Sequence, residues 1–112
     1  MTEHLGAFPP RESALAERLA ASATADREFQ TILQQAVAAT VESRRRLDAL
    51  EAEIRESAGA WAGLDTPAGN REFQQYLATK TREIHRIVAD AADDSRRRAN
   101  AVSALADRYP AG

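Results

Sequence analysis

The first half of the chain carries one long helical pattern of apolar and polar residues. Residues 11–58 contain no proline or glycine and are rich in Ala, Leu, Glu, Arg and Gln, which favour helices. Their apolar residues recur at alternating spacings of three and four, which places them along one side of a helix. These residues are Leu15, Leu19, Phe29, Leu33, Ala36, Leu47, Leu50 and Ile54. We predict one long helix here, although the segment SATAD at 22–26 could kink it or restart it with Thr24 or Asp26 as a cap.

The sequence GAWAGLDTPAG at 59–69 interrupts the pattern. Gly59 and Gly63 lower the helix propensity. Thr66, or Asp65, is a good N-cap, and Pro67 suits the first position of a helix because no amide donor is needed there. A second helical pattern then runs from residue 67 to residue 108. Its apolar positions are Phe73, Leu77, Ile84, Val88, Ala91, Val102, Leu105 and Tyr109.

Two arms of similar length around a single turn at 59–66 predict an all-α fold, an antiparallel helical hairpin. The alternative is a chain of three helices with a break at 93–95, where Asp93-Asp94-Ser95 could cap the third. We assign the hairpin domain to residues 11–109. Residues 1–10 contain glycine and two prolines without helical periodicity, and we expect a flexible N-terminal tail there.

The apolar residues are too few and too small for a deep core. Hydrophobic residues make up 44% of the chain, but 25 residues are alanine. Such a chain usually completes its core with another chain, so we expect the hairpin to form a bundle by dimerisation, either with itself or with a paired small helical protein. The residues expected in the core or at the partner interface are Leu33, Leu47, Leu50, Ile54, Phe73, Leu77, Ile84 and Val88.

Charge and composition narrow the possible partners and locations. The formal net charge is −2, which argues against bulk attraction to nucleic acid or to an anionic membrane. No apolar run approaches the roughly 20 residues that a membrane span requires. The N-terminus MTEHLGAFPP lacks the features of a secretory signal peptide. We therefore expect a protein that is cytoplasmic or exported by a route without such a signal.

Residues suited to catalysis or metal binding are scarce. The chain has no cysteine, and neither His4 nor His85 has a second ligand at helical spacing. Asp93 and Asp94 each precede an arginine by four residues, so capping and ion pairing explain them without a metal. We therefore expect no enzymatic activity, no cofactor, no metal and no small-molecule substrate.

Two arginine runs, 44–46 and 96–98, raise the possibility of nucleic-acid binding. Consecutive residues on a helix point in different directions, however, and no aromatic residues accompany the runs for base stacking. Ion pairs at helical spacing neutralise much of the first run. The expected pairs are Glu42 with Arg46, Arg44 with Asp48, and Glu51 with Arg55. Nucleic-acid binding is thus the third choice, and we expect no nucleic-acid partner.

Two segments resemble known families. Trp61-Ala62-Gly63 between two long helices resembles the WXG family of small helical hairpins of type VII (ESX) secretion systems, with Trp61 and Gly63 as the turn motif. The composition looks actinobacterial, and LDTPAGNREFQQYLATKTREI at 64–84 is similar to mycobacterial domains of unknown function. The WXG resemblance implies a dimeric four-helix bundle exported in folded form.

One feature departs from the WXG pattern. Members of that family or their partners carry Tyr-x-x-x-Asp/Glu near the C-terminus, whereas Tyr109 here precedes only Pro110, Ala111 and Gly112, and Tyr76 precedes Lys80 at that spacing. Either a partner supplies the export signal, or the protein stays in the cytoplasm, or the resemblance is only a shared hairpin shape. We expect a non-enzymatic, protein-binding hairpin that is a WXG-like secreted substrate or accessory partner of a type VII secretion system. The alternative function is a cytoplasmic coiled-coil adaptor or chaperone unrelated to secretion.

Overall fold

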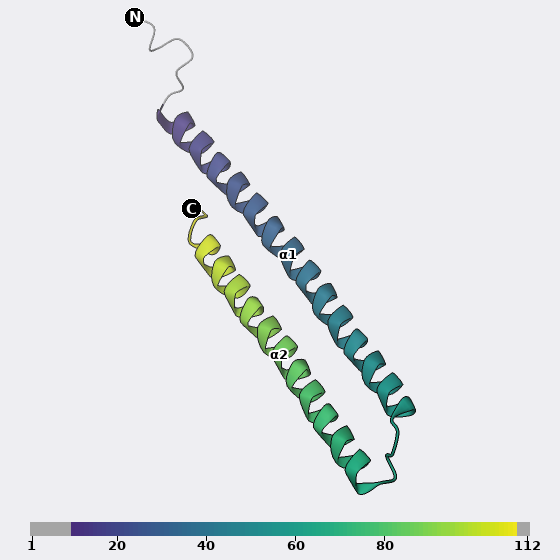
Figure 1. Ribbon diagram of the computed structural model, residues 1–112. Coiled ribbons are helices and arrows are strands. Elements are labelled where there is room, and N and C mark those ends of the chain that lie inside the picture. Colours follow the sequence, from purple (N-terminus) through teal and green to yellow (C-terminus); the bar gives the residue numbers. More distant parts are fainter. Residues whose placement is uncertain (1–9, 110–112) are drawn as a thin grey trace, which may run out of the picture. The chain divides into compact units, whose positions relative to one another are not determined.

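The computed structural model describes residues 10–109, which form two helices joined by a short loop (Figure 1). Helix α1 spans Pro10–Ala60 and helix α2 spans Pro67–Ala106. The described residues contain no strand. The all-α helical hairpin predicted from the sequence is therefore confirmed. The expected tail lies outside the described residues, apart from Pro10, which begins α1.

Both helices are continuous, so the preferred prediction of two long helices is confirmed and the alternative interruptions within them are absent. At SATAD, the hydroxyl of Thr24 donates to the carbonyl of Ala20, 3.0 Å away, so the residue stays inside α1 and caps nothing. The alternative break at 93–95 is also absent, because α2 runs through it. Asp93 forms an ion pair with Arg96 along the same helix instead of capping a third one.

The contacts divide the described chain into two compact units. The loop unit consists of residues 36–96, and the terminal unit consists of residues 10–35 with 97–109. In each unit a segment of α1 runs antiparallel to a segment of α2: Ser57 bonds to Tyr76 in the loop unit, and Glu28 bonds to Arg108 in the terminal unit.

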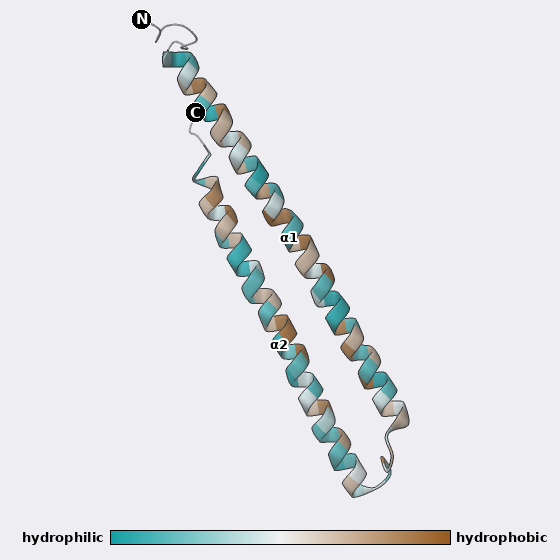
Figure 2. Ribbon diagram, turned by 45° about the horizontal axis from the view of Figure 1, so that its top comes forward, coloured by the Kyte–Doolittle hydropathy of each residue, from teal (hydrophilic) through white to brown (hydrophobic). Residues whose placement is uncertain are grey.

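Each unit has a small apolar core. Among the described residues, only four hydrophobic side chains are buried: Leu50 and Ile87 in the loop unit, and Ala25 and Leu105 in the terminal unit. Figure 2 shows why: short hydrophobic stretches alternate with hydrophilic ones along both helices instead of forming a continuous apolar block. Many large apolar side chains are therefore left near the surface.

Candidate protein-binding surfaces

The loop between the helices is held by backbone and side-chain bonds around Gly63 and Thr66. Gly63 has a φ of 73°, a left-handed conformation that glycine adopts without strain. The hydroxyl of Thr66 donates to the carbonyl of Gly63 at 2.7 Å and accepts from the amide of Gly69 at 3.1 Å. Thr66 is thus the N-cap of α2, with Pro67 at the first helical position, as predicted.

Gly69 connects this loop to the first turn of α2. It is buried, and a Cβ built on it would lie 2.0 Å from the carbonyl oxygen of Gly63, so only glycine fits. Its own carbonyl accepts the indole N–H of Trp61 at 3.2 Å. Trp61, Gly63 and Gly69 therefore form one interlocked turn.

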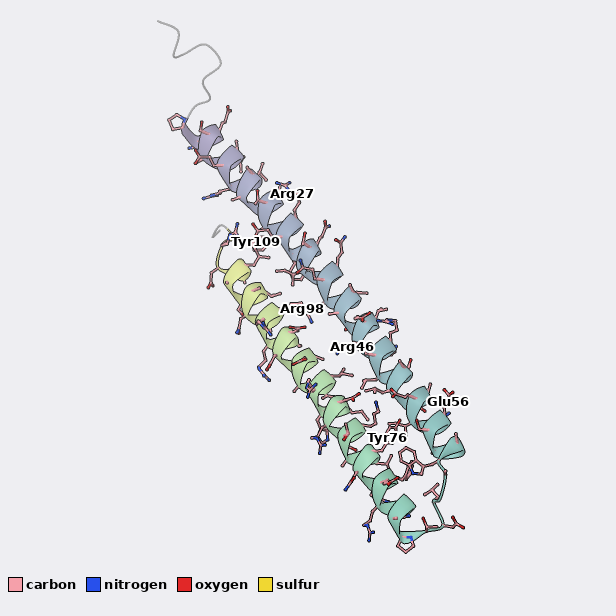
Figure 3. The ribbon with its side chains drawn as sticks, in the orientation of Figure 1. Arg27, Arg46, Glu56, Tyr76, Arg98 and Tyr109 are labelled. Carbon is pink, nitrogen blue, oxygen red and sulfur yellow. The ribbon has the colours of Figure 1, made fainter. Side chains whose placement is uncertain are left out.

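Three aromatic rings pack where the loop meets the two helices. The ring of Trp61 lies 5.2 Å from that of Phe73, in an edge-to-face arrangement, and 5.2 Å from that of Tyr76. The phenol of Tyr76, labelled in Figure 3, hydrogen-bonds to the hydroxyl of Ser57 on α1 at 2.8 Å. The cluster joins the loop to both helices, which gives Trp61 a structural role.

Lys80 lies next to this cluster, between the two helices of the loop unit. Its side chain is only 14% exposed, and its ammonium lies 2.8 Å from Glu53 of α1 and 5.5 Å from the ring centre of Tyr76. The hydrogen bond to Glu53 is the main cause that raises the pKa of Lys80 above its ordinary value. Sequence reasoning missed this contact because the two residues lie far apart along the chain.

The loop unit has an apolar groove on one side of the helix pair. Leu47 and Ile54 of α1 and Ile84 of α2 line it, and its volume is about 420 Å³. Glu51 and Arg55 form its charged edge and pair with each other at 2.7 Å, which confirms that predicted ion pair. A second apolar surface could cover this groove without meeting an unpaired charge from the lining residues.

A second groove, the basic groove, has a volume of about 340 Å³. It is lined by Arg45, Arg46, Ala49, Leu50, Glu83, Arg86 and Ile87. Arg45 forms an ion pair with Glu42 at 2.7 Å, whereas the sequence pattern had paired Glu42 with Arg46. That hydrogen bond raises the pKa of Arg45 and lowers that of Glu42.

The expected core and interface residues occupy different environments. Leu50 is buried, whereas Leu33 and Val88 are 48% and 53% exposed. The remaining five are half-buried: Leu47, Ile54, Phe73, Leu77 and Ile84. Leu47, Ile54 and Ile84 meet at the apolar groove, and Phe73 belongs to the aromatic cluster. Three buried residues are absent from the expected set: Ile87, Ala25 and Leu105, of which only Leu105 belongs to a predicted apolar stripe. Ile87 and Val88 are neighbours in the sequence and point to different sides of α2, so Ile87 is buried and Val88 is exposed.

The terminal unit contains a smaller groove near the end of α2. Phe29, Val102, Leu105, Ala106 and Tyr109 line a volume of about 290 Å³. Charged contacts tie the two chain segments together beside it. Arg108 pairs with Glu28, with one nitrogen–oxygen distance of 2.9 Å, and the phenol of Tyr109 donates to Asp26 at 2.5 Å. The second bond raises the pKa of Tyr109, since the carboxylate of Asp26 accepts a hydrogen bond from the protonated phenol and so stabilises that form.

Among residues 10–109, no group of three or more His, Asp or Glu side chains gathers as metal ligands would. Neither described helix has an apolar stretch long enough to cross a bilayer.

Comparison with known proteins finds one matching family and several similar mycobacterial proteins. Residues 1–112 match a domain of unknown function, DUF4226. The uncharacterized protein Rv0739 of Mycobacterium tuberculosis (strain ATCC 25618 / H37Rv) is 42% identical over 103 residues, which cover 90% of this chain and 38% of that protein. The uncharacterized protein MT0028 of strain CDC 1551 / Oshkosh is 42% identical over 88% of this chain and 84% of that protein.

The uncharacterized protein Rv0026 of strain ATCC 25618 / H37Rv is 33% identical over 94% of this chain but only 23% of its own length. The chain thus spans well under half of two of these relatives. No solved structure matches the chain.

Proposed function

The chain belongs to the DUF4226 family of unknown function, and we propose that it is a non-enzymatic protein-binding hairpin. It buries its apolar groove against another helical protein, which is a second copy of the chain or a paired small helical protein. The expected mycobacterial relationship of the second half is established by the family match and the relatives. The activity itself is our proposal.

One observation carries this proposal: the apolar groove at Leu47, Ile54 and Ile84 is open in the isolated chain. Val88 lies four residues after Ile84, on the same side of α2, and is largely exposed. Burying apolar side chains of this size stabilises an assembly by about 1.5–3 kcal/mol each. A partner helix packed along this side would therefore supply the core that the single hairpin lacks.

The more specific version of the proposal is a WXG-like substrate or accessory partner of a type VII secretion system. It is supported by Trp61 and Gly63 in an interlocked turn between two long helices. Tyr76 is held by Ser57 inside the hairpin, so it does not present an export signal. On this version the partner carries the Tyr-x-x-x-acid signal.

A cytoplasmic adaptor or chaperone is the second candidate. The size of the relatives favours it, because the matching segment makes up 38% of Rv0739 and 23% of Rv0026. A hairpin attached to a larger protein would bring that protein to its partner. Secretion predicts that the chain appears in mycobacterial culture filtrate and disappears from it when the secretion apparatus is inactivated, whereas an adaptor stays with the cells.

The groove is tested by placing a carboxylate in it. We expect Leu47→Asp and Ile84→Asp each to dissociate the assembly, since a buried, unpaired carboxylate costs several kcal/mol. The measurement is light scattering behind size exclusion at several concentrations, with helicity followed by circular dichroism. Ala52→Asp is the matched control, because Ala52 is exposed and points away from the groove.

A dimer that Ala52→Asp retains and the groove variants lose would support the proposal. A wild-type monomer that melts weakly, and that a separate helical partner stabilises through the same groove, would support the paired version. If Leu47→Asp left both the mass and the thermal midpoint unchanged, the groove would not be a binding surface and the proposal would be wrong.

A further inference from the structure

We propose that the basic groove is a second binding site, which takes a helical segment of a partner protein with carboxylate side chains on one face. The site is distinct from the apolar groove. It rests on the proposed protein-binding function only in that its ligand is a protein. Figure 3 labels Arg46 on α1, one of the two arginines on which the inference depends.

The two arginines line the groove from opposite helices. Arg46 comes from α1 and Arg86 from α2, and the floor between them consists of Ala49, Leu50 and Ile87. Leu50 and Ile87 are buried core residues, so the floor is fixed in place. A ligand that lies on this floor has a guanidinium group on each side.

The charges in the groove do not cancel. Arg45 is neutralised by Glu42, and Glu83 at the groove edge lies 3.5 Å from Lys80. Among the described residues, neither Arg46 nor Arg86 takes part in a close ion pair or hydrogen bond, and Arg46 has only a longer-range attraction to Glu42, whose close bond is to Arg45. Each guanidinium therefore retains its N–H donors for a ligand. An anion between the two positive charges would also be attracted to both.

The chemistry of the lining selects carboxylates on an apolar backing. A guanidinium donates two parallel hydrogen bonds to a carboxylate, and the alanine, leucine and isoleucine floor accepts aliphatic side chains. An amphipathic helix with Glu or Asp beside Leu or Ala presents both groups. Nucleic acid fits less well, because the groove has no aromatic residue for base stacking and Glu83 would face the phosphates.

The test measures binding of a fluorescein-labelled helical peptide of two Glu-Ala-Leu-Glu-Ala-Ala-Leu repeats by fluorescence anisotropy. Its control peptide has Gln in place of every Glu. We expect the double variant Arg46→Gln, Arg86→Gln to weaken binding of the acidic peptide by at least about tenfold, since two charge-assisted contacts are lost. Arg46→Lys, Arg86→Lys keeps the charge but loses the planar fork, so an intermediate loss is expected.

Arg44→Gln, Arg71→Gln is the matched control because it removes the same charge from two exposed arginines outside the groove. Arg44 lies on the opposite side of α1 from Arg46, and Arg71 is about four turns from Arg86. This control should bind the acidic peptide as the wild type does. Light scattering should give the Arg46→Gln, Arg86→Gln protein the wild-type mass, so that failure of this site is distinguishable from failure of the apolar groove.

Three results would overturn the proposal. The first is no binding of the acidic peptide, or equal binding of the Gln peptide. The second is an equal loss in both double Gln variants, which would mean that only net charge matters. The third is tighter binding of a short single-stranded DNA that the Arg46→Gln, Arg86→Gln variant abolishes, which would make the groove a nucleic-acid site.

Discussion

Gly69 has no room for a side chain, although it lies in a helix where alanine is normally preferred. A Cβ there would meet the carbonyl of Gly63 at 2.0 Å and the hydroxyl of Thr66 at 3.0 Å. We expect Gly69→Ala to lower the free energy of unfolding by roughly 1–3 kcal/mol, because the loop must move and Trp61 loses a well-placed acceptor. Urea unfolding measures the change.

Gly59 is the matched control at the other side of the turn. It lies in the last turn of α1, with nothing within 4 Å of a built Cβ. Gly59→Ala should therefore raise the free energy of unfolding by roughly 0.5–1 kcal/mol, the ordinary helix preference of alanine over glycine. If both substitutions stabilised the protein, the close approach of Gly69 to the loop would be incorrect.

At the scale of the helices, one lysine connects α1 and α2 in the loop unit, and it is the only lysine in the chain. The bond to Glu53 raises the pKa of Lys80 above 10.5. The stabilisation is therefore fully present below pH 10.5, the ordinary value, and is lost as the pH rises through the raised pKa. We expect the thermal midpoint of unfolding to decrease as the pH rises through that alkaline range.

The Lys80→Gln variant isolates this effect. It should have a lower midpoint than the wild type at neutral pH and a smaller further loss in alkaline solution. Tyr109 titrates with the same sign, since Asp26 raises its pKa above 10.0, so the comparison is made in a Tyr109→Phe background. Identical alkaline profiles with and without Lys80 would show that the pair with Glu53 does not stabilise the fold.

The helices themselves could be predicted from the sequence, but the faces that they bury could be predicted only in part. Thr66, Pro67 and the glycines of the turn act locally, so their roles follow from neighbouring residues. The apolar stripe of α1 repeats every 3.5 residues, whereas an α-helix has 3.6 per turn, and the difference is about 20° per heptad. Between Leu33 and Leu50 it accumulates to about 50°, so Leu50 is buried while Leu33 is 48% exposed.

Contacts between the two helices could not be predicted from the sequence for a different reason: they join residues that lie far apart along the chain. Lysine is normally a surface residue, and only the position of Glu53 on the other helix makes the burial of Lys80 favourable. The basic groove likewise depends on which arginines lack an acidic neighbour. The helical spacing predicts a pair between Glu42 and Arg46, whereas the close bond goes to Arg45 and leaves Arg46 with only a longer-range attraction to Glu42.

At the scale of the whole chain, stability is distributed unevenly along α1. The first turns of α1 run past the last described turn of α2 in Figure 1, and Leu15 and Leu19 are 52% and 63% exposed. A helical segment without packing is marginal in water, because its few hydrogen bonds barely offset the ordering of the chain. Residues 11–20 should therefore open far more readily than residues 47–54 and 80–91, which hold the core of the loop unit.

Amide hydrogen exchange followed by NMR measures this difference residue by residue. In the chain alone, we expect amides of residues 11–20 to exchange at rates close to those of an unfolded peptide, and amides near Leu50 and Ile87 to show the highest protection. Uniform protection along α1 would contradict this, and would mean that its first turns are already covered in solution. A partner that packs on Leu15 and Leu19 should selectively slow exchange in residues 11–20, so the same measurement identifies whether binding extends beyond the loop unit.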